Sequence, residues 1–110
     1  MEYEQIELIN VCQSTINIIN GSQEMAGKSE RMTLAWTSHY MIGNLVYPGV
    51  IRIYYCDQRL SFYIEKDRID LYLRSNDFKG LIGSISKDCD TNTLSRLVTE
   101  AIVKLACCNV

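Results

Sequence analysis

The clearest pattern along the chain is a set of three short segments in which apolar and polar side chains alternate. The segments cover residues 50–56, 59–65 and 68–74, and short links separate them at residues 57–58 and 66–67. Alternation with a period of two is typical of strands that bury one face. Links of two residues predict tight antiparallel hairpins, so these segments are expected to form a three-stranded meander.

Tight turns at both links define which residues lie opposite one another. In that register Ile53 lies opposite Phe62, and Phe62 lies opposite Leu71. The residues expected on this face are all apolar or aromatic: Ile51, Ile53, Tyr55, Leu60, Phe62, Ile64, Ile69, Leu71 and Leu73. A shift of one residue would turn a whole strand's apolar side chains to the other face, so the agreement supports this register.

The opposite face of the meander is predicted to be polar and rich in tyrosine. The same register gives three rows: Tyr54, Ser61 and Tyr72; Arg52, Tyr63 and Asp70; and Cys56, Arg59 and Arg74. Tyrosine and arginine anchor many protein interfaces, because they combine a large contact area with hydrogen-bonding groups. Tyrosine is also a favoured strand residue, so a purely structural role is the alternative. The candidate protein-binding residues are Tyr54, Tyr63, Tyr72, Arg52, Arg59 and Arg74.

Apolar residues at spacings of three and four predict a helix on each side of the meander. Residues 2–20 form the first, and its expected buried stripe is Ile6, Ile9, Cys12, Ile16 and Ile19. The second runs to residue 106 after a cap at Asp90 or Thr91. Its expected stripe is Leu94, Leu97, Val98, Ala101, Ile102 and Leu105.

Further strands are expected next to the meander. Residues 32–37 alternate, and residues 40–47 predict a short strand with a possible Gly43-Asn44 turn, which Pro48-Gly49 closes. Residues 78–86 predict an edge strand broken by glycine. The expected fold is a single α+β domain over residues 1–110, with a helix, an antiparallel meander of four or five strands, and a helix. Both helices are expected on one sheet face.

Composition and charge narrow the class of protein. The 110 residues are 47% hydrophobic and 22% charged, as in ordinary globular domains. The net charge of −2, without long runs of one sign, argues against binding nucleic acid by general phosphate neutralisation, although it permits a local basic patch. The acidic first residues and the lack of a long apolar stretch predict a soluble cytoplasmic protein with no membrane partner.

The chain offers little for catalysis, metals or cofactors. The cysteines are Cys12, Cys56, Cys89, Cys107 and Cys108. They lack the spacing of a zinc site and are expected to be free thiols in a reducing compartment. The reactivity of Cys107 and Cys108 is left open. The segment from Gly21 to Ser29 has five residues where a phosphate-binding loop needs four. His39 is the only histidine and has no second catalytic motif around it. We therefore expect no enzyme, no metal and no cofactor.

The leading hypothesis is a non-catalytic protein-binding module, acting as an adaptor, an inhibitor or an immunity-type protein, with a homodimer as one option. Compact acidic proteins of this kind are common among phage and mobile-element genes that block a host enzyme. One alternative is an RNA or single-strand nucleic-acid-binding domain. The order of a helix, three antiparallel strands and a helix resembles the double-stranded-RNA-binding domain, but residues 86–90 are net acidic where that family is basic. A second alternative is an acidic secretion-type chaperone, which would dimerise and bind an extended segment.

Overall fold

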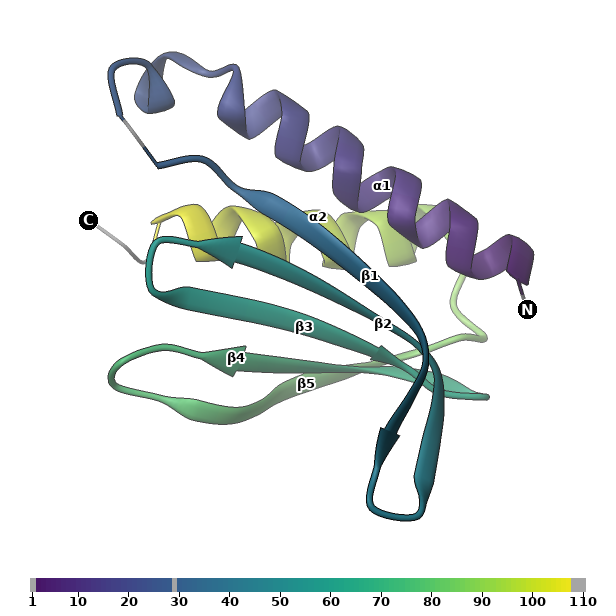
Figure 1. The fold of residues 1–110 in the computed structure, drawn as a ribbon. Coiled ribbons are helices and arrows are strands. Elements are labelled where there is room, and N and C mark those ends of the chain that lie inside the picture. Colours follow the sequence, from purple (N-terminus) through teal and green to yellow (C-terminus); the bar gives the residue numbers. More distant parts are fainter. Residues whose placement is uncertain (1, 29, 108–110) are drawn as a thin grey trace.

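Two helices cover one face of a five-stranded antiparallel sheet (Figure 1). The computed structural model describes residues 2–28 and 30–107. The strand order in the sheet follows the chain, β1-β2-β3-β4-β5. The elements are α1 (Glu2–Asn20), the 3-10 turn η1 (Gln23–Met25), β1 (Thr33–Ile42), β2 (Leu45–Tyr55), β3 (Gln58–Ile64), β4 (Arg68–Arg74), β5 (Lys79–Ser86) and α2 (Thr91–Cys107). The predicted α+β fold class is confirmed.

The hairpin between β3 and β4 has the predicted register. Phe62 lies opposite Leu71, and Ile64 lies opposite Ile69. The backbone N–H of Glu65 donates to the carbonyl of Arg68 at 2.8 Å, which closes the two-residue turn.

The hairpin between β2 and β3 is shifted by two residues from the prediction. Phe62 lies opposite Ile51 instead of Ile53, because the turn consists of Cys56 and Asp57. Cys56 adopts a left-handed conformation with φ 54°. Glycine, asparagine and aspartate are the usual residues there, so the sequence favoured a turn one position later. A shift of two keeps every side chain on its face, and eight of the nine predicted residues are buried, with Leu73 half-buried.

β1 and β2 form a longer hairpin than the pattern predicted. The Gly43-Asn44 turn is confirmed, and Gly43 has a φ of 61°. Pro48-Gly49 does not close a turn but lies inside β2, so the prediction was wrong there. β2 pairs with β3 only from Gly49 onward, and the missing N–H of Pro48 therefore costs no hydrogen bond to β3.

Gly49 lies beneath the indole ring of Trp36. A Cβ on Gly49 would come within 2.2 Å of the Cη2 atom of Trp36, so only glycine permits this contact. An aromatic ring over a strand glycine covers the backbone that the absent side chain leaves bare. The close contact explains why a glycine is compatible with a long strand here.

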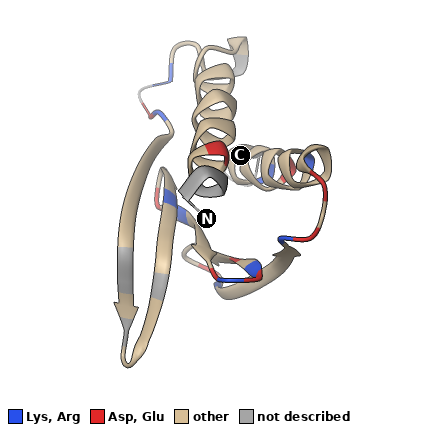
Figure 2. Ribbon diagram, turned by 90° about the vertical axis from the view of Figure 1, so that its right-hand side faces the viewer, with Lys and Arg blue, Asp and Glu red and all other residues tan. Residues whose placement is uncertain are grey.

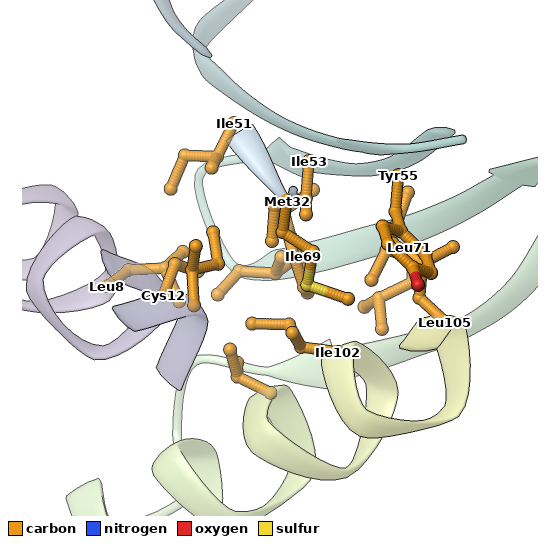
Figure 3. Packing of buried hydrophobic residues seen from close by; sticks show 14 of the residues in the cluster. Leu8, Cys12, Met32, Ile51, Ile53, Tyr55, Ile69, Leu71, Ile102 and Leu105 are labelled. Atoms are coloured by element: carbon orange, nitrogen blue, oxygen red, sulfur yellow. The ribbon is translucent and has the colours of Figure 1, made fainter. Parts of the chain in front are cut away.

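The core lies between the helices and the covered face of the sheet. Figure 3 shows residues of α1 and α2 meeting the strands there: Leu8, Cys12, Ile102, Leu105, Ile53, Ile69 and Leu71. The stripe predicted for α2 is confirmed, with Val98 among its buried members. Its cap is also confirmed, since the backbone N–H of Thr93 donates to Oδ1 of Asp90 at 2.7 Å. This bond is the main reason that the pKa of Asp90 is lowered.

The stripe predicted for α1 is partly wrong. Ile6 is 56% exposed, whereas Leu8 is buried in its place. α1 packs against α2 as well as against the sheet, so the buried side of α1 also includes Thr15. The Thr15 hydroxyl lies 3.4 Å from the Thr99 hydroxyl of α2 and donates to the carbonyl of Val11 at 2.8 Å.

The loop between α1 and β1 is a packed structural connection. Met25 is buried, and the Tyr55 hydroxyl donates to its sulfur at 3.4 Å. The Asn20 side chain both donates to the carbonyl of Met32, at 3.0 Å, and accepts from its N–H, at 2.9 Å. In the described residues the next element after Lys28 is β1, whereas a phosphate-binding loop would lead directly into a helix.

Candidate protein-binding surface

The open face of the sheet, on the side away from the helices, carries the residues predicted to bind a partner (Figure 1). The shift between β2 and β3 rearranges the predicted rows. The observed rows across the strands are Thr33, Tyr54, Arg59, Arg74 and Lys79; Ala35, Arg52, Ser61, Tyr72 and Leu81; and Thr37, Val50, Tyr63, Asp70 and Ser84. Tyr54 therefore lies opposite Arg59 and not Ser61. Arg52 lies opposite Ser61 and not Tyr63.

The structure brings two of the three tyrosines together. The rings of Tyr63 and Tyr72 meet edge to face, with centroids 5.0 Å apart and an interplanar angle of 79°. This geometry is favourable for aromatic pairs. Tyr54 lies on β2, two strands away from Tyr72, and both keep more than a third of their surface exposed, at 38% and 37%. The predicted tyrosine cluster is therefore a pair with one separate member.

Three cations form a row across β3, β4 and β5. Arg59 lies directly opposite Arg74, and Arg74 lies directly opposite Lys79. Among the described residues none of the three has an ion pair or a side-chain hydrogen bond. Like charges directly opposite one another destabilise a sheet, so this row is suited to a negatively charged binding partner. We call it the cationic row.

Two shallow hollows lie beside the cationic row. The first, of about 440 Å³, is lined by Tyr54, by the row itself and by residues of the two adjacent turns, with Asp57 as its one acidic member. The second, of about 340 Å³, adds Ser61, Tyr63 and Tyr72. Lys79 was missed by sequence reasoning, because an irregularity in the β4–β5 pairing at residues 71–72 could not be read from the pattern. The hollows place aromatic rings next to the unpaired cations.

The acidic residue of the open face is already neutralised within the protein. Asp70 is buried and accepts from Nε of Arg68 at 3.0 Å and from Oγ of Ser84 at 2.7 Å. Arg68 also lies 3.4 Å from a carboxylate oxygen of Glu65. Asp70 is therefore a structural residue, and the positive charge of the cationic row is not balanced from this end of the face.

The hairpin of β1 and β2 extends beyond β3 as a two-stranded arm, residues 39–48. β3 ends opposite Gly49, so beyond this point β2 pairs only with β1. Figure 2 shows the arm projecting away from the helices and from the other strands. From Met32 to Ile51 the sequence has no Lys, Arg, Asp or Glu. Sequence reasoning missed the arm because it placed a turn at residues 48–49.

Apolar side chains of the arm are exposed. Met41 is 64% exposed, Leu45 is 62% exposed and Val46 is 57% exposed. Large apolar side chains gathered on one projecting element are typical of a surface that binds another protein. The side chain of His39, the histidine considered for catalysis, lies outside the described side chains.

The two edge strands of the sheet differ in how well they are protected against pairing with another molecule. β1 pairs only with β2, and its free edge carries no charged residue, no proline and no irregularity in its pairing. β5, at the other edge, has Lys79, two glycines and the pairing irregularity. Charges and bulges are common devices that prevent an edge strand from pairing with another molecule. β1 lacks these devices.

Three of the five cysteines have side chains among those that the structure describes. Cys12, Cys56 and Cys89 are free thiols, and burial raises the pKa of Cys12 to about 12. The side chains of Cys107 and Cys108 lie outside the described side chains. Within residues 2–28 and 30–107 no three His, Cys, Asp or Glu side chains gather to hold a metal ion. The described helices include none with the length and apolar character needed to cross a membrane.

Known proteins offer no guide to this surface. Comparisons of the chain with family models, with curated proteins and with solved structures find no match.

Proposed function

We propose that the protein is a non-catalytic protein-binding module that binds its partner through the arm and the free edge of β1. The observation that carries the proposal is the arm itself, an exposed apolar element without charge on an unprotected strand. An extended segment of a partner protein would add a strand to β1, with backbone hydrogen bonds giving affinity and apolar contacts giving specificity. This binding mode suits an adaptor, an inhibitor or an immunity-type protein.

The open face defines a second property of the partner. Figure 1 shows the arm bending away from the helices, so the arm and the open face border the same side of the molecule. The cationic row lies at the end of the strands away from the arm, so a partner that is held by the arm and also covers the open face would meet the unpaired Arg59, Arg74 and Lys79, which favour an acidic surface. Tyr54 and Tyr72 would supply contact area next to these charges.

The test is capture of the partner by matched variants. The tagged protein is incubated with lysate of its native cell, and bound protein and nucleic acid are identified. Leu45→Asp places a charge on the arm, and Ile18→Asp makes the same change on α1, where Ile18 is 74% exposed. We expect one stoichiometric protein to be retained by wild type and Ile18→Asp and to be lost by Leu45→Asp. Equal capture by both variants would refute the role of the arm.

A second candidate function is binding of single-stranded nucleic acid, and the cationic row beside exposed tyrosines favours it. Phosphates would contact the cations, and bases would stack on the aromatic rings. An electrophoretic shift of single-stranded RNA at low salt, lost at higher salt and in Arg74→Gln, would support this function. No shift of wild type at low salt would exclude it.

The proposal also covers the cellular compartment of the protein and its oligomeric state. The free thiols Cys12, Cys56 and Cys89 support a reducing compartment such as the cytoplasm. A second copy of the chain is one partner that could pair with β1, which would give a homodimer as expected of a secretion-type chaperone. Sedimentation of the purified protein distinguishes this arrangement from a heterologous complex.

A further inference from the structure

A cavity of about 450 Å³ lies between α2 and the covered face at the β4–β5 side of the sheet. Its walls are mainly apolar and include Leu60, Leu71, Leu73, Ile82, Leu97 and Leu105. Pockets that bind small molecules span roughly 300–1,000 Å³ and have walls of this kind. An apolar cavity of about 150 Å³ is enough to bind benzene. The volume therefore suits a ligand several times larger than benzene.

The cavity exists because α2 covers only part of the sheet. α2 packs against β2 and β3, which leaves the covered face of β4 and β5 less protected. Gly83 lies opposite Leu71 and contributes no side chain, and a Cβ built on it would meet no atom within 4 Å. Ile82, beside the pairing irregularity, stays 47% exposed. The space is thus a consequence of the sequence of β5.

Two of the polar side chains that line the cavity, Gln58 and Lys104, offer hydrogen-bond donors without a partner in the described chain. Nε2 of Gln58 is buried and has no hydrogen-bond partner among the described residues. Lys104 also lines the cavity and forms no ion pair within the described part of the chain. The carboxylate of Glu100, by contrast, accepts from Nη1 of Arg96 at 3.2 Å. A buried polar group without a partner is costly, so Gln58 is suited to a ligand that brings an acceptor.

We propose that this cavity binds a small amphipathic carboxylate, with its apolar chain against the leucines and isoleucines and its carboxylate bonded to Gln58 and Lys104. Both the apolar walls and the two unpartnered donors are matched by this class of ligand. The site is separate from the arm and goes beyond the proposed protein-binding function.

The experiment is a calorimetric titration of the full chain with laurate below its micelle concentration. We expect saturable binding of one laurate per chain. Gly83→Val places a side chain in the cavity opposite Leu71, so it should weaken laurate binding about tenfold or more while the thermal midpoint stays the same or rises. Gln58→Leu keeps the volume but removes the donor, so it should weaken laurate binding about tenfold or more and weaken 1-dodecanol binding less, because a neutral hydroxyl oxygen accepts a weaker hydrogen bond than a carboxylate does.

Controls separate this site from the rest of the surface. Lys104→Gln should weaken laurate binding, whereas Lys66→Gln, at the exposed β3–β4 turn, should not. Leu45→Asp on the arm should bind laurate like wild type, so the two proposals fail independently. No saturable binding by wild type, or unchanged binding in a folded Gly83→Val, would overturn the inference.

Discussion

The covered and open faces of the sheet are built by the same strands but are held by different forces. On the covered face Ile51, Phe62 and Ile64 are buried under two helices. On the open face Tyr54 and Tyr72 stay exposed, and Asp70 is the one buried carboxylate. Apolar burial stabilises a fold in proportion to the area removed from water, so the covered face supplies most of the stability. The open face is left able to carry side chains that a partner can use.

The largest expected effect is on the covered face. Phe62→Asp would bury an unpaired charge at a cost of several kcal/mol, which is comparable with the total stability of about 5–15 kcal/mol of a small domain. We expect circular dichroism to show no cooperative unfolding transition. Tyr63→Ala, one residue along β3 and on the open face, should stay folded. A folded Phe62→Asp protein would mean that the two faces are not as different as the structure shows.

A smaller effect is expected where the covered face passes into the arm. Gly49→Val would force the Trp36 ring away, because a Cβ at this position comes within 2.2 Å of it. We expect the free energy of unfolding, measured in urea, to fall by about 1–3 kcal/mol, and the fluorescence of Trp36 to change. The additional change Trp36→Ala should recover part of this loss, since it removes the overlap. If the losses in the free energy of unfolding caused by Gly49→Val and by Trp36→Ala simply added up in the double variant, that result would contradict the contact.

The open face is tested at its buried carboxylate. Asp70→Ala removes the acceptor of Arg68 and Ser84, and we expect a loss of about 1–2 kcal/mol in the free energy of unfolding. Ser84→Ala, which removes only one of the two bonds, should cost less than Asp70→Ala. If Asp70→Ala lowered the free energy of unfolding as much as Phe62→Asp, the hydrogen bonds of Asp70 would contribute as much to stability as the apolar burial on the covered face.

The smallest effect is expected at the start of α2. The hydrogen bond from Thr93 lowers the pKa of Asp90 in the folded protein, so the stabilisation is present above the unfolded-state pKa and is lost as pH falls through the folded-state pKa. Asp90→Asn keeps an acceptor for the cap but does not titrate. Unfolding curves measured between neutral and acidic pH should therefore show a weaker pH dependence for Asp90→Asn than for wild type.

The sequence predicted the faces of the sheet more accurately than the neighbours on each face. Alternation identified all nine covered residues, because a two-residue shift leaves the pattern unchanged. The rows of the open face depend on the register itself. The left-handed Cys56 moved the β2–β3 turn by one position, so the predicted neighbours of Tyr54 and Arg52 were wrong.

Two features could not be predicted from local patterns. The arm could not be predicted because Pro48 and Gly49 are usual turn residues. Their place inside β2 is possible because β3 does not extend as far as Pro48 and because the ring of Trp36 lies over Gly49. The cavity depends on how far α2 reaches over β5, which is a property of packing. The lack of charge from residue 32 to residue 51 was the available signal for the arm.

The order of the strands has a consequence for the rate of folding. Every strand pairs with its neighbour in the chain, so the sheet forms through local contacts, which are the fast ones. The contact of α1 with α2 instead joins residues as far apart as Thr15 and Thr99, separated by 84 positions. Closing so long a loop costs entropy before its contacts form. The docking of the two helices is therefore expected to be the late event in folding, with the meander already paired.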